Sequence, residues 1–508
     1  MEDEARDLKG RTAKGAVWMM LEQTCTQGLN FTLGIILAHL LTPTDYGIVA
    51  LVMIFITVGQ VLVTSGLGQA LVQKKEVDVL DFTMVFYLGL AVAAVLYVVL
   101  FFAAPSVAAF YKNDGLVPVL RVLTLNLFLI AIGSVQAAEV CRAMRFDLSF
   151  RIALSAVLTS FIVGVVLAAA GFGVWAIVWS CTLSNLVGVI VRGILLKWRL
   201  CRGFDLARLK PLYRFGWKMM ASSLVSVSLS NLYGVLVGRL YSPADLAFVN
   251  KSRNLPDLLR TNLNTVFTQT GLAALSRMQD EIARMREALR RLMAVNVFIV
   301  FPSMILLCLI ARDLILFLYG EQWTTCIPYL RVLSVGTAFG VLEGVNSLPA
   351  LARGRSDLVL KASIVRTVLA IAVLVVFLPH GISSWILATA FVYGPLSLLI
   401  DVYLADRMVG YTWRMVAADV LPTVVLFGAV ACVVHALDFV LVGDAIFDLF
   451  VRLVAKAALA FVLFVAGAIV FRLRAMREIS LFLSPRLSSR FPIWARLAAY
   501  LEGGRANS

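Results

Sequence analysis

Long apolar segments separated by short polar ones run along most of the chain. Residues 84–104, for example, read MVFYLGLAVAAVLYVVLFFAA and show no alternation of polar and apolar positions. A helix that crosses a bilayer needs about 20 such residues, whereas a strand of a membrane barrel alternates over about 10. Backbone groups in the hydrocarbon region must bond within their own segment or barrel, so these segments are expected to be helices. The pattern predicts an all-α polytopic membrane protein.

The apolar segments number fourteen, which predicts about 14 transmembrane helices. The most polar of them is the eighth, LLRTNLNTVFTQTGLAALS, which is retained because the charge asymmetry described below fails without it. The predicted spans lie at about 15–41, 46–69, 82–104, 115–140, 149–170, 172–196, 213–240, 257–276, 289–311, 327–352, 358–379, 382–405, 416–436 and 447–471.

The first twelve segments form an internal repeat. PVLRVL at 118–123 returns as PYLRVL at 328–333, and Trp175 returns as Trp385, in both cases 210 residues later. Earlier in the chain the offset is 200, where Pro43 and Asp45 match Pro243 and Asp245. Two halves of six helices enter the membrane from the same side, so we expect a pseudo-two-fold axis along the membrane normal and a substrate site between the halves.

The repeat gives the predicted domain organisation. The extra segments after the second half form a helix pair of their own, and the residues beyond them are basic. The predicted parts are an N-terminal six-helix lobe at 1–208, a C-terminal six-helix lobe at 209–410, an additional helix pair 13–14 at 411–474, and a basic cytoplasmic tail at 475–508.

Composition and charge agree with a membrane protein. Of 508 residues, 61% are hydrophobic and 15% are charged, with a mean hydropathy of +0.91, whereas about a quarter of a soluble protein is charged. The net charge of +15 would suggest nucleic acid in a soluble chain. Membrane proteins instead place Lys and Arg in cytoplasmic loops. With the N-terminus inside, 35 of the 45 basic residues fall on the cytoplasmic side, which predicts both termini in the cytoplasm and no nucleic-acid partner.

No motif for a cofactor, a metal or ATP hydrolysis can be recognised. The seven cysteines are scattered without a Cys-x-x-Cys pair, and the chain has only three histidines. It contains no phosphate-binding Gly-x-x-x-x-Gly-Lys-Ser/Thr loop. We therefore expect no metal site, no cofactor and no enzymatic activity.

A polar stripe marks the first predicted helix. In WMMLEQTCTQGLNFTLG, the adjacent residues Glu22 and Gln23 are followed by Gln27 and Asn30 at steps of four and three positions, so all four share one helix face. Such a face is costly in lipid. It either lines a watery cavity or bonds to neighbouring helices.

Basic residues on the predicted external side are few and clustered. Arg121 and Arg331 are the arginines of the repeated PxLRVL phrase, and they either form a cationic rim on a central cavity or serve a structural role at the interface. Arg239, Arg253 and Arg260 surround the seventh and eighth segments. They either belong to a solvated loop or bind an anionic ligand. A diphosphate is the natural candidate, because guanidinium groups match phosphate bidentately.

Two further features concern acidic and amphipathic positions. Glu343, in the tenth segment, either pairs with an arginine or exchanges protons.

The segment SRMQDEIARMREALRRL at 276–292 has the charge spacing of a surface helix that lies in the cytoplasmic interface and contacts membrane lipids.

Four stretches resemble one family. They read LTPTDYGIVALVMIF (41–55), SGLGQALVQKK (65–75), VLRVLTLNLFLIAIGSVQAAEVCRAMRFD (119–147) and GFGVWAIV (171–178). They resemble the polysaccharide-exporting branch of the MOP (multidrug/oligosaccharidyl-lipid/polysaccharide) exporter superfamily. More narrowly, they resemble the Wzx-type lipopolysaccharide and exopolysaccharide flippases, which include the colanic-acid exporter. The resemblance covers about residues 9–410. It does not identify which individual residues contact the substrate.

The resemblance implies a MOP flippase or MATE-like fold in the bacterial inner membrane. It implies that the substrate is a polyprenyl-diphosphate-linked oligosaccharide repeat unit, moved to the periplasmic leaflet by alternating access through a cationic cavity. The polysaccharide polymerase and the chain-length regulator are further candidate partners.

Two other functions stay open at this point. A cation-coupled multidrug antiporter of the same superfamily would be expected to have twelve helices and an acidic site. A membrane glycosyltransferase or polymerase would be expected to have paired carboxylates or a large external loop, and neither is visible in the sequence.

Overall fold

The computed structural model describes residues 2–64, 66–74, 77–197, 201, 206–440 and 446–487. Within these ranges every regular element is a helix, so the all-α prediction is confirmed. The chain folds as two compact units, Met1–Ala247 and Phe248–Ser508. The predicted lobe boundary at 208/209 depends on the sequence repeat alone and stays a prediction.

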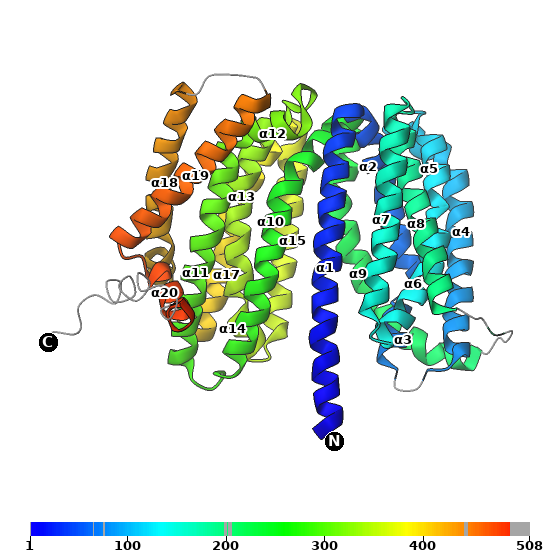
Figure 1. Ribbon diagram of the computed structural model, residues 1–508, viewed down its shortest axis with the longest axis horizontal. Coiled ribbons are helices and arrows are strands. Elements are labelled where there is room, and N and C mark those ends of the chain that lie inside the picture. The colour runs from blue at the N-terminus through cyan, green and yellow to red at the C-terminus, as the bar shows by residue number, and fades with distance from the viewer. Residues whose placement is uncertain are drawn as a thin grey trace. The chain divides into compact units, whose positions relative to one another are not determined.

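The first unit is a bundle in which α7 packs along both α1 and α8, and α2 packs on α9 (Figure 1). Its helices are α1 (Glu2–Leu40), α2 (Pro43–Thr64), α3 (Leu67–Gln73), α4 (Val79–Tyr111), α5 (Leu116–Thr124), α6 (Asn126–Arg142), α7 (Phe146–Ala169), α8 (Val174–Leu196) and α9 (Leu206–Leu240).

The second unit is built around α11, which packs against α13, α18 and α20. Helix α10 (Pro243–Ser276) begins at the end of the first unit and continues into the second. The other elements are α11 (Ile282–Leu309), α12 (Ala311–Tyr319), η1 (Glu321–Trp323), α13 (Cys326–Asn346), α14 (Leu348–Ala352), α15 (Ser356–Phe377), η2 (Leu378–His380), α16 (Ile382–Ala388), η3 (Thr389–Tyr393), α17 (Gly394–Val409), α18 (Trp413–Val440), α19 (Ile446–Val470) and α20 (Arg474–Leu487).

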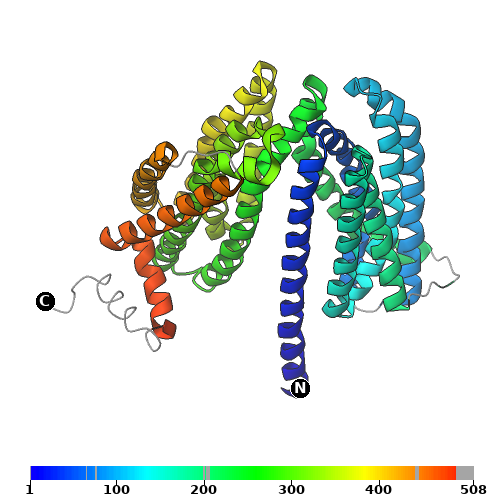
Figure 2. The ribbon, with the colours of Figure 1, turned by 45° about the horizontal axis from the view of Figure 1, so that its top comes forward.

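Twelve helices among the described residues are long and apolar enough to cross a membrane. They include α18 and α19, which lie beside each other as a pair (Figures 1 and 2). The spans predicted at 15–41 and 257–276 correspond to α1 and α10, which are long but not among the twelve. The predicted count of fourteen is therefore approximate, while the multi-pass membrane architecture is confirmed.

The sequence repeat is visible in local structure at the starts of α2 and α10. Asp45 accepts hydrogen bonds from the backbone N–H and the hydroxyl of Thr42, at 3.0 and 2.7 Å. Asp245 accepts the same two bonds from Ser242, again at 3.0 and 2.7 Å. In both copies a proline follows the capping residue, a position where its missing N–H costs nothing. The repeated Pro-x-Asp phrase is thus a repeated helix start.

Small residues let the elements of the first unit approach closely. A Cβ added at Gly47 would lie 1.9 Å from the backbone oxygen of Pro243, and one added at Gly238 would lie 2.2 Å from Leu51. Glycine is required at Gly47 because a backbone atom occupies the space that a side chain would need, whereas at Gly238 the Leu51 side chain would have to move.

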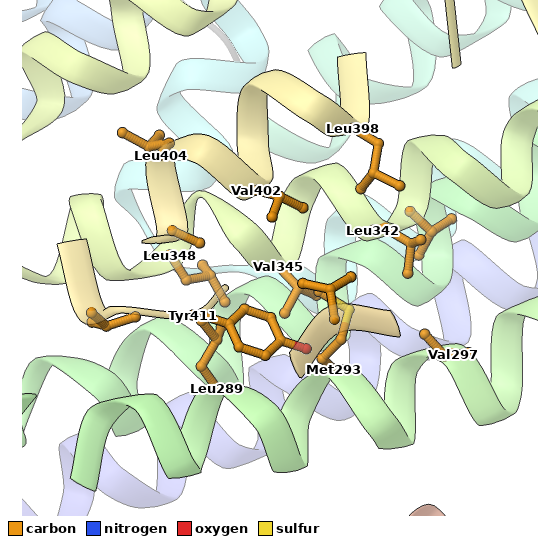
Figure 3. Packing of buried hydrophobic residues seen from close by; sticks show 14 of the residues in the cluster. Leu289, Met293, Val297, Leu342, Val345, Leu348, Leu398, Val402, Leu404 and Tyr411 are labelled. Carbon is orange, nitrogen blue, oxygen red and sulfur yellow. The ribbon is translucent and has the colours of Figure 1, made fainter. Parts of the chain in front are cut away.

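The apolar core of the second unit joins α11, α13, α14 and α17 (Figure 3). Leu289, Met293 and Val297 recur every four residues, so they share one face of α11. That face packs against Val345 and Val402 among others, and all five side chains are buried. Because lipid is as apolar as these side chains, close van der Waals packing holds this part of the unit together.

A charged cluster connects α11 to α18 and α20. Arg290 donates two hydrogen bonds to Asp419, at 2.9 and 2.8 Å, and Arg474 donates another at 3.1 Å. The phenol of Tyr411 also donates to Asp419, at 3.1 Å. Burial and the adjacent Asp419 carboxylate raise the pKa of Tyr411 well above its usual value.

This cluster corrects one prediction. The segment 276–292 is not a separate surface helix, because α11 begins at Ile282 and residues 282–292 are its first turns. Its apolar positions pack in the core and its charges pair with α18 and α20. The tail predicted at 475–508 includes most of α20 (Arg474–Leu487), and its residues 488–508 lie outside the described part of the chain.

Candidate functional site

A polar cavity of about 250 Å³ lies inside the second unit. Helix α10 forms one side, α13 a second, and the stretch from α16 through η3 to α17 a third. The cavity is lined by Arg253, Asp257, Arg260, Leu333, Gly336, Thr337, Gly340, Glu343, Trp385, Ile386, Thr389, Ala390, Tyr393 and Gly394. Three of the residues predicted from sequence, Arg253, Arg260 and Glu343, are therefore brought together here.

The α10 side carries a row of alternating charges. Asp257 lies between two arginines, 3.7 Å from Arg253 and 3.5 Å from Arg260, measured from carboxylate oxygen to guanidinium Nε. The three residues are spaced by four and three positions, so they share one face of the helix. The Arg260 side chain is 43% exposed, which leaves guanidinium N–H groups available to a ligand in the cavity.

The α13 side is made of small residues. Gly336, Gly340 and Gly344 recur every four positions and form one face. A Cβ at Gly344 would lie 2.3 Å from the Asn264 side-chain oxygen of α10, and one at Gly336 would lie 2.9 Å from the Ala390 Cα. The glycines thus let α10 and η3 approach α13 closely and hold the polar groups around one small volume.

The third side contains a π-helical turn. The Gly394 N–H bonds to the Thr389 carbonyl, five residues earlier, instead of to residue 390. Pro395 follows directly, and because proline has no N–H the α-helical bond from 395 to 391 cannot form. Such turns inside helices are frequent at functional sites. Here the turn places Thr389, Ala390 and Tyr393 on the cavity wall.

Two carboxylates are held in the interior of the unit, and one of them, Glu343, lines the cavity. Glu343 accepts a hydrogen bond from the Ser397 hydroxyl. Asp401, which is fully buried, accepts one from Arg366 at 2.5 Å. Glu343 and Tyr393 both lie within electrostatic reach of Arg260 and Arg366. Charges at this depth are costly unless paired or hydrogen-bonded, and these groups satisfy that condition.

Sequence reasoning missed Arg366, Asp401 and Ser397. Arg366 lies near the middle of α15. The available signal was a lone charge inside an apolar segment, since Arg366 and Asp401 each interrupt one.

The polar stripe of α1 lies in the first unit. Glu22 is half-buried and within electrostatic reach of Arg192 on α8, whose Nη1 donates to the Gly133 carbonyl at 3.2 Å. Gln27 and Asn30 are exposed. Arg192 is a further functional candidate that sequence reasoning missed. The stripe is therefore partly bonded to its neighbours and partly accessible.

The remaining predicted arginines are not in the polar cavity. Arg121 lies over the Phe101 ring at 4.2 Å and donates to the Phe101 carbonyl at 3.4 Å, which favours its structural alternative. Arg239 lies over the Phe110 ring at 5.2 Å, and Arg331 is exposed at the start of α13. A cationic rim formed by these residues stays a prediction.

The first unit contains a larger and more apolar cavity of about 940 Å³. It lies between α2, α3, α6 and α9, and its polar groups are hydroxyls and amides such as Thr57, Gln60 and Ser223. None of the predicted residues of this unit is among its lining residues within the described ranges.

Fold and cavity together define a polytopic helical membrane protein whose second unit contains a cavity lined by both basic and acidic side chains. Two solved structures share the fold. The lipid II flippase MurJ, in an inward closed conformation, matches with a TM-score of 0.70 at 12% identity over 90% of this chain and 98% of MurJ. An inward-facing multidrug resistance MATE transporter of the MOP superfamily matches with a TM-score of 0.55 at 16% identity over 78% of this chain and 98% of its own.

Sequence comparison identifies the family. The pattern of the family described as polysaccharide biosynthesis protein matches residues 36–328, and the chain belongs to that family. The lipopolysaccharide biosynthesis protein WzxC of Escherichia coli (strain K12) is 26% identical over 73% of this chain and 75% of WzxC. The succinoglycan biosynthesis transport protein ExoT of Rhizobium meliloti (strain 1021) is 24% identical over 80% of each chain. The resemblance to the polysaccharide-exporting branch of the MOP superfamily is confirmed.

Proposed function

We propose that the protein moves polyprenyl-diphosphate-linked oligosaccharide repeat units across the bacterial inner membrane by alternating access. In this proposal the units serve lipopolysaccharide or exopolysaccharide synthesis and pass from the cytoplasmic to the periplasmic leaflet, and both chain termini lie in the cytoplasm. Membership of the polysaccharide biosynthesis family supports the proposal, as do the names of relatives that act in lipopolysaccharide biosynthesis and succinoglycan transport.

The observation that carries the proposal furthest is the arginine pair in the polar cavity. Arg253 and Arg260 lie on one face of α10 and point to a volume also lined by Thr337, Thr389 and Tyr393. Guanidinium groups bind diphosphate strongly, and the neighbouring hydroxyls suit the sugar next to it. We propose these residues as the diphosphate site, with Glu22, Gln27 and Asn30 of α1 as candidate contacts for sugar hydroxyls.

The test is complementation of a strain that lacks the gene. Arg260→Ala and Arg253→Ala should reduce surface polysaccharide and cause lipid-linked repeat units to accumulate at equal protein levels. Arg355→Ala is the matched control, because Arg355 is exposed and pairs with Asp357 on the surface. Full export by both cavity variants, alone and combined, would contradict the proposed site.

The multidrug antiporter is the competing function. It would be expected to have an acidic site for cationic drugs and no helices beyond the twelve of the repeat. The cavity carries two arginines, Arg253 and Arg260, beside its carboxylates Asp257 and Glu343, so it is not a purely acidic site. In addition, α18 and α19 extend the second unit. Drug accumulation in a pump-deficient strain separates the two, since the flippase should leave it unchanged.

The polysaccharide polymerase and the chain-length regulator are proposed as partners of the exported product, together with the surrounding membrane lipids. The protein itself is proposed to perform no covalent chemistry. A glycosyltransferase would be recognised by sugar transfer from a nucleotide sugar in vitro, which we expect to be absent.

A further inference from the structure

The charges around Glu343 are balanced in number. The described groups that face it are Arg253, Asp257 and Arg260 from α10, Arg366 from α15, Tyr393 from η3 and Asp401 from α17. Three guanidinium groups thus oppose three carboxylates when Glu343 is ionised. When Glu343 carries a proton, the same cluster has one positive charge in excess.

Glu343 differs from the other two carboxylates in how it is held. Asp257 lies between two guanidinium groups, and Asp401 is bonded directly to the third. Glu343 is instead hydrogen-bonded to a hydroxyl, that of Ser397. A carboxylate next to a guanidinium strongly favours the ionised form, whereas a hydroxyl partner leaves both forms possible.

The Ser397 hydroxyl can serve either form without moving its oxygen. It has acceptors in two directions, the Glu343 carboxylate and the Gly394 carbonyl, the latter at 2.8 Å. A hydroxyl has one hydrogen and can also accept. It donates to Glu343 when the carboxylate is ionised. When Glu343 is protonated, Ser397 accepts from it and donates to Gly394 instead. Rotation of one O–H bond accommodates the proton.

We propose that Glu343 is a proton-binding site that controls anion binding in the polar cavity, an inference that rests on the proposed function. When Glu343 takes up a proton from the cavity, the cluster that contains Arg253 and Arg260 has one net positive charge. This excess charge favours binding of the diphosphate. Loss of the proton to water restores neutrality and favours release. Binding of the proton and of the diphosphate therefore strengthen each other, as linkage requires.

The experiment uses the purified full-length protein in nanodiscs and farnesyl diphospho-N-acetylglucosamine as probe, because a diphosphate diester does not itself titrate near neutral pH. Calorimetry at pH 5.5 to 8.5, in buffers of different ionisation enthalpy, gives both the affinity and the number of protons taken up. The wild type should take up one proton on binding, and its affinity should fall by up to about tenfold per pH unit in the alkaline range.

Glu343→Gln should bind the probe with no proton uptake and with an affinity that is independent of pH. Glu139→Gln, which removes a half-buried carboxylate from α6 in the first unit, should behave as the wild type. Glu343→Asp keeps a titrating group and should retain proton uptake, which serves as a second variant if Glu343→Gln folds poorly.

The outcomes distinguish the proton site at Glu343 from the flippase function on which it rests. Binding without proton uptake in the wild type, or unchanged uptake in Glu343→Gln, overturns the proton site and leaves the flippase proposal intact. Failure of the wild type to bind the probe at any pH overturns the proposed diphosphate site and the proton site with it.

Discussion

Lys456 of α19 donates a hydrogen bond to Asp313 of α12 at 2.5 Å, and both side chains are only 2% exposed. Arg452, one turn earlier on α19, lies 3.5 Å from the same carboxylate. Both basic residues lie inside α19 (Ile446–Val470), where a charge needs a partner. They attach the additional helix pair to the body of the second unit.

Removing the acid from this cluster should destabilise the protein. Asp313→Asn removes the carboxylate that Lys456 and Arg452 share, and breaking a buried ion pair of this kind costs about 3–5 kcal/mol. Thermal unfolding in detergent should show a clearly lower Tm. Asp406→Asn, which changes an exposed carboxylate on α17, is the control and should leave the Tm unchanged. An unaltered Tm in Asp313→Asn would show that the buried pair contributes little.

Arg366 and Asp401 should behave as one unit. Either Arg366→Gln or Asp401→Asn leaves a charge of α15 or α17 without its partner, whereas the double variant removes both charges. We expect each single change to lower stability by about 3–5 kcal/mol. The double variant should lose markedly less than the sum of the two. A double-mutant cycle measures this coupling, and additive losses would argue against a direct interaction.

The glycines of α13 should not tolerate a side chain. In Gly336→Ala the new Cβ would meet the Ala390 backbone at 2.9 Å, so α13 must move away from η3 and open the cavity. Overpacking of this kind costs about 1–3 kcal/mol, and export should fall. Gly428→Ala on α18 is the control, because a Cβ there meets nothing within 4 Å. Equal export by the two variants would contradict the close packing described.

Gly47 should be the least replaceable glycine of the first unit. Gly47→Ala places a Cβ 1.9 Å from the Pro243 backbone oxygen, where neither group can rotate away. We expect loss of folded protein in the membrane, measured by fluorescence-detected size exclusion. Gly34→Ala, with open space around it, should give normal yields. A normal elution profile for Gly47→Ala would mean that α2 and α10 begin further apart.

The π-helical turn depends on Pro395. Pro395→Ala restores an N–H that can bond to residue 391, so the turn should relax to regular α-helix and rotate Tyr393 relative to the cavity. Export should decrease while the Tm stays the same or rises. Pro302→Ala, within α11 and away from the cavity lining, controls for the loss of a helix proline. Full export by Pro395→Ala would show that the turn has no role in transport.

The fold class could be predicted from the sequence because it depends on one strong signal, the length of the apolar segments. Apolar segments of membrane length gave the helical class, and the Pro-x-Asp and PxLRVL phrases gave the repeat. The start of α11 was placed seven residues late, at 289 instead of Ile282, because the charges of Arg284, Glu287 and Arg290 suggested solvent. Arg290 and Glu287 are paired with Asp419 and Arg474 within the protein, which a single sequence does not reveal.

The site was predicted only in part for a similar reason. Arg253, Arg260 and Glu343 stood out as polar exceptions in their own segments, and they do lie around one cavity. Their companions Ser397, Gly336 and the π-turn carry no charge, and a hydroxyl or a glycine in an apolar helix is unremarkable by itself. Only the packing of α13 against η3 and α17 gives them a role.

Asp419 accepts hydrogen bonds from Arg290, Arg474 and Tyr411. This network gives a way to observe motion of the second unit. Because it ties α20 to α11 and α18, a spectroscopic label on the surface of α20 will travel with the second unit. Such a probe, read against one in the first unit, offers a direct view of the transport cycle without disturbing the cavity.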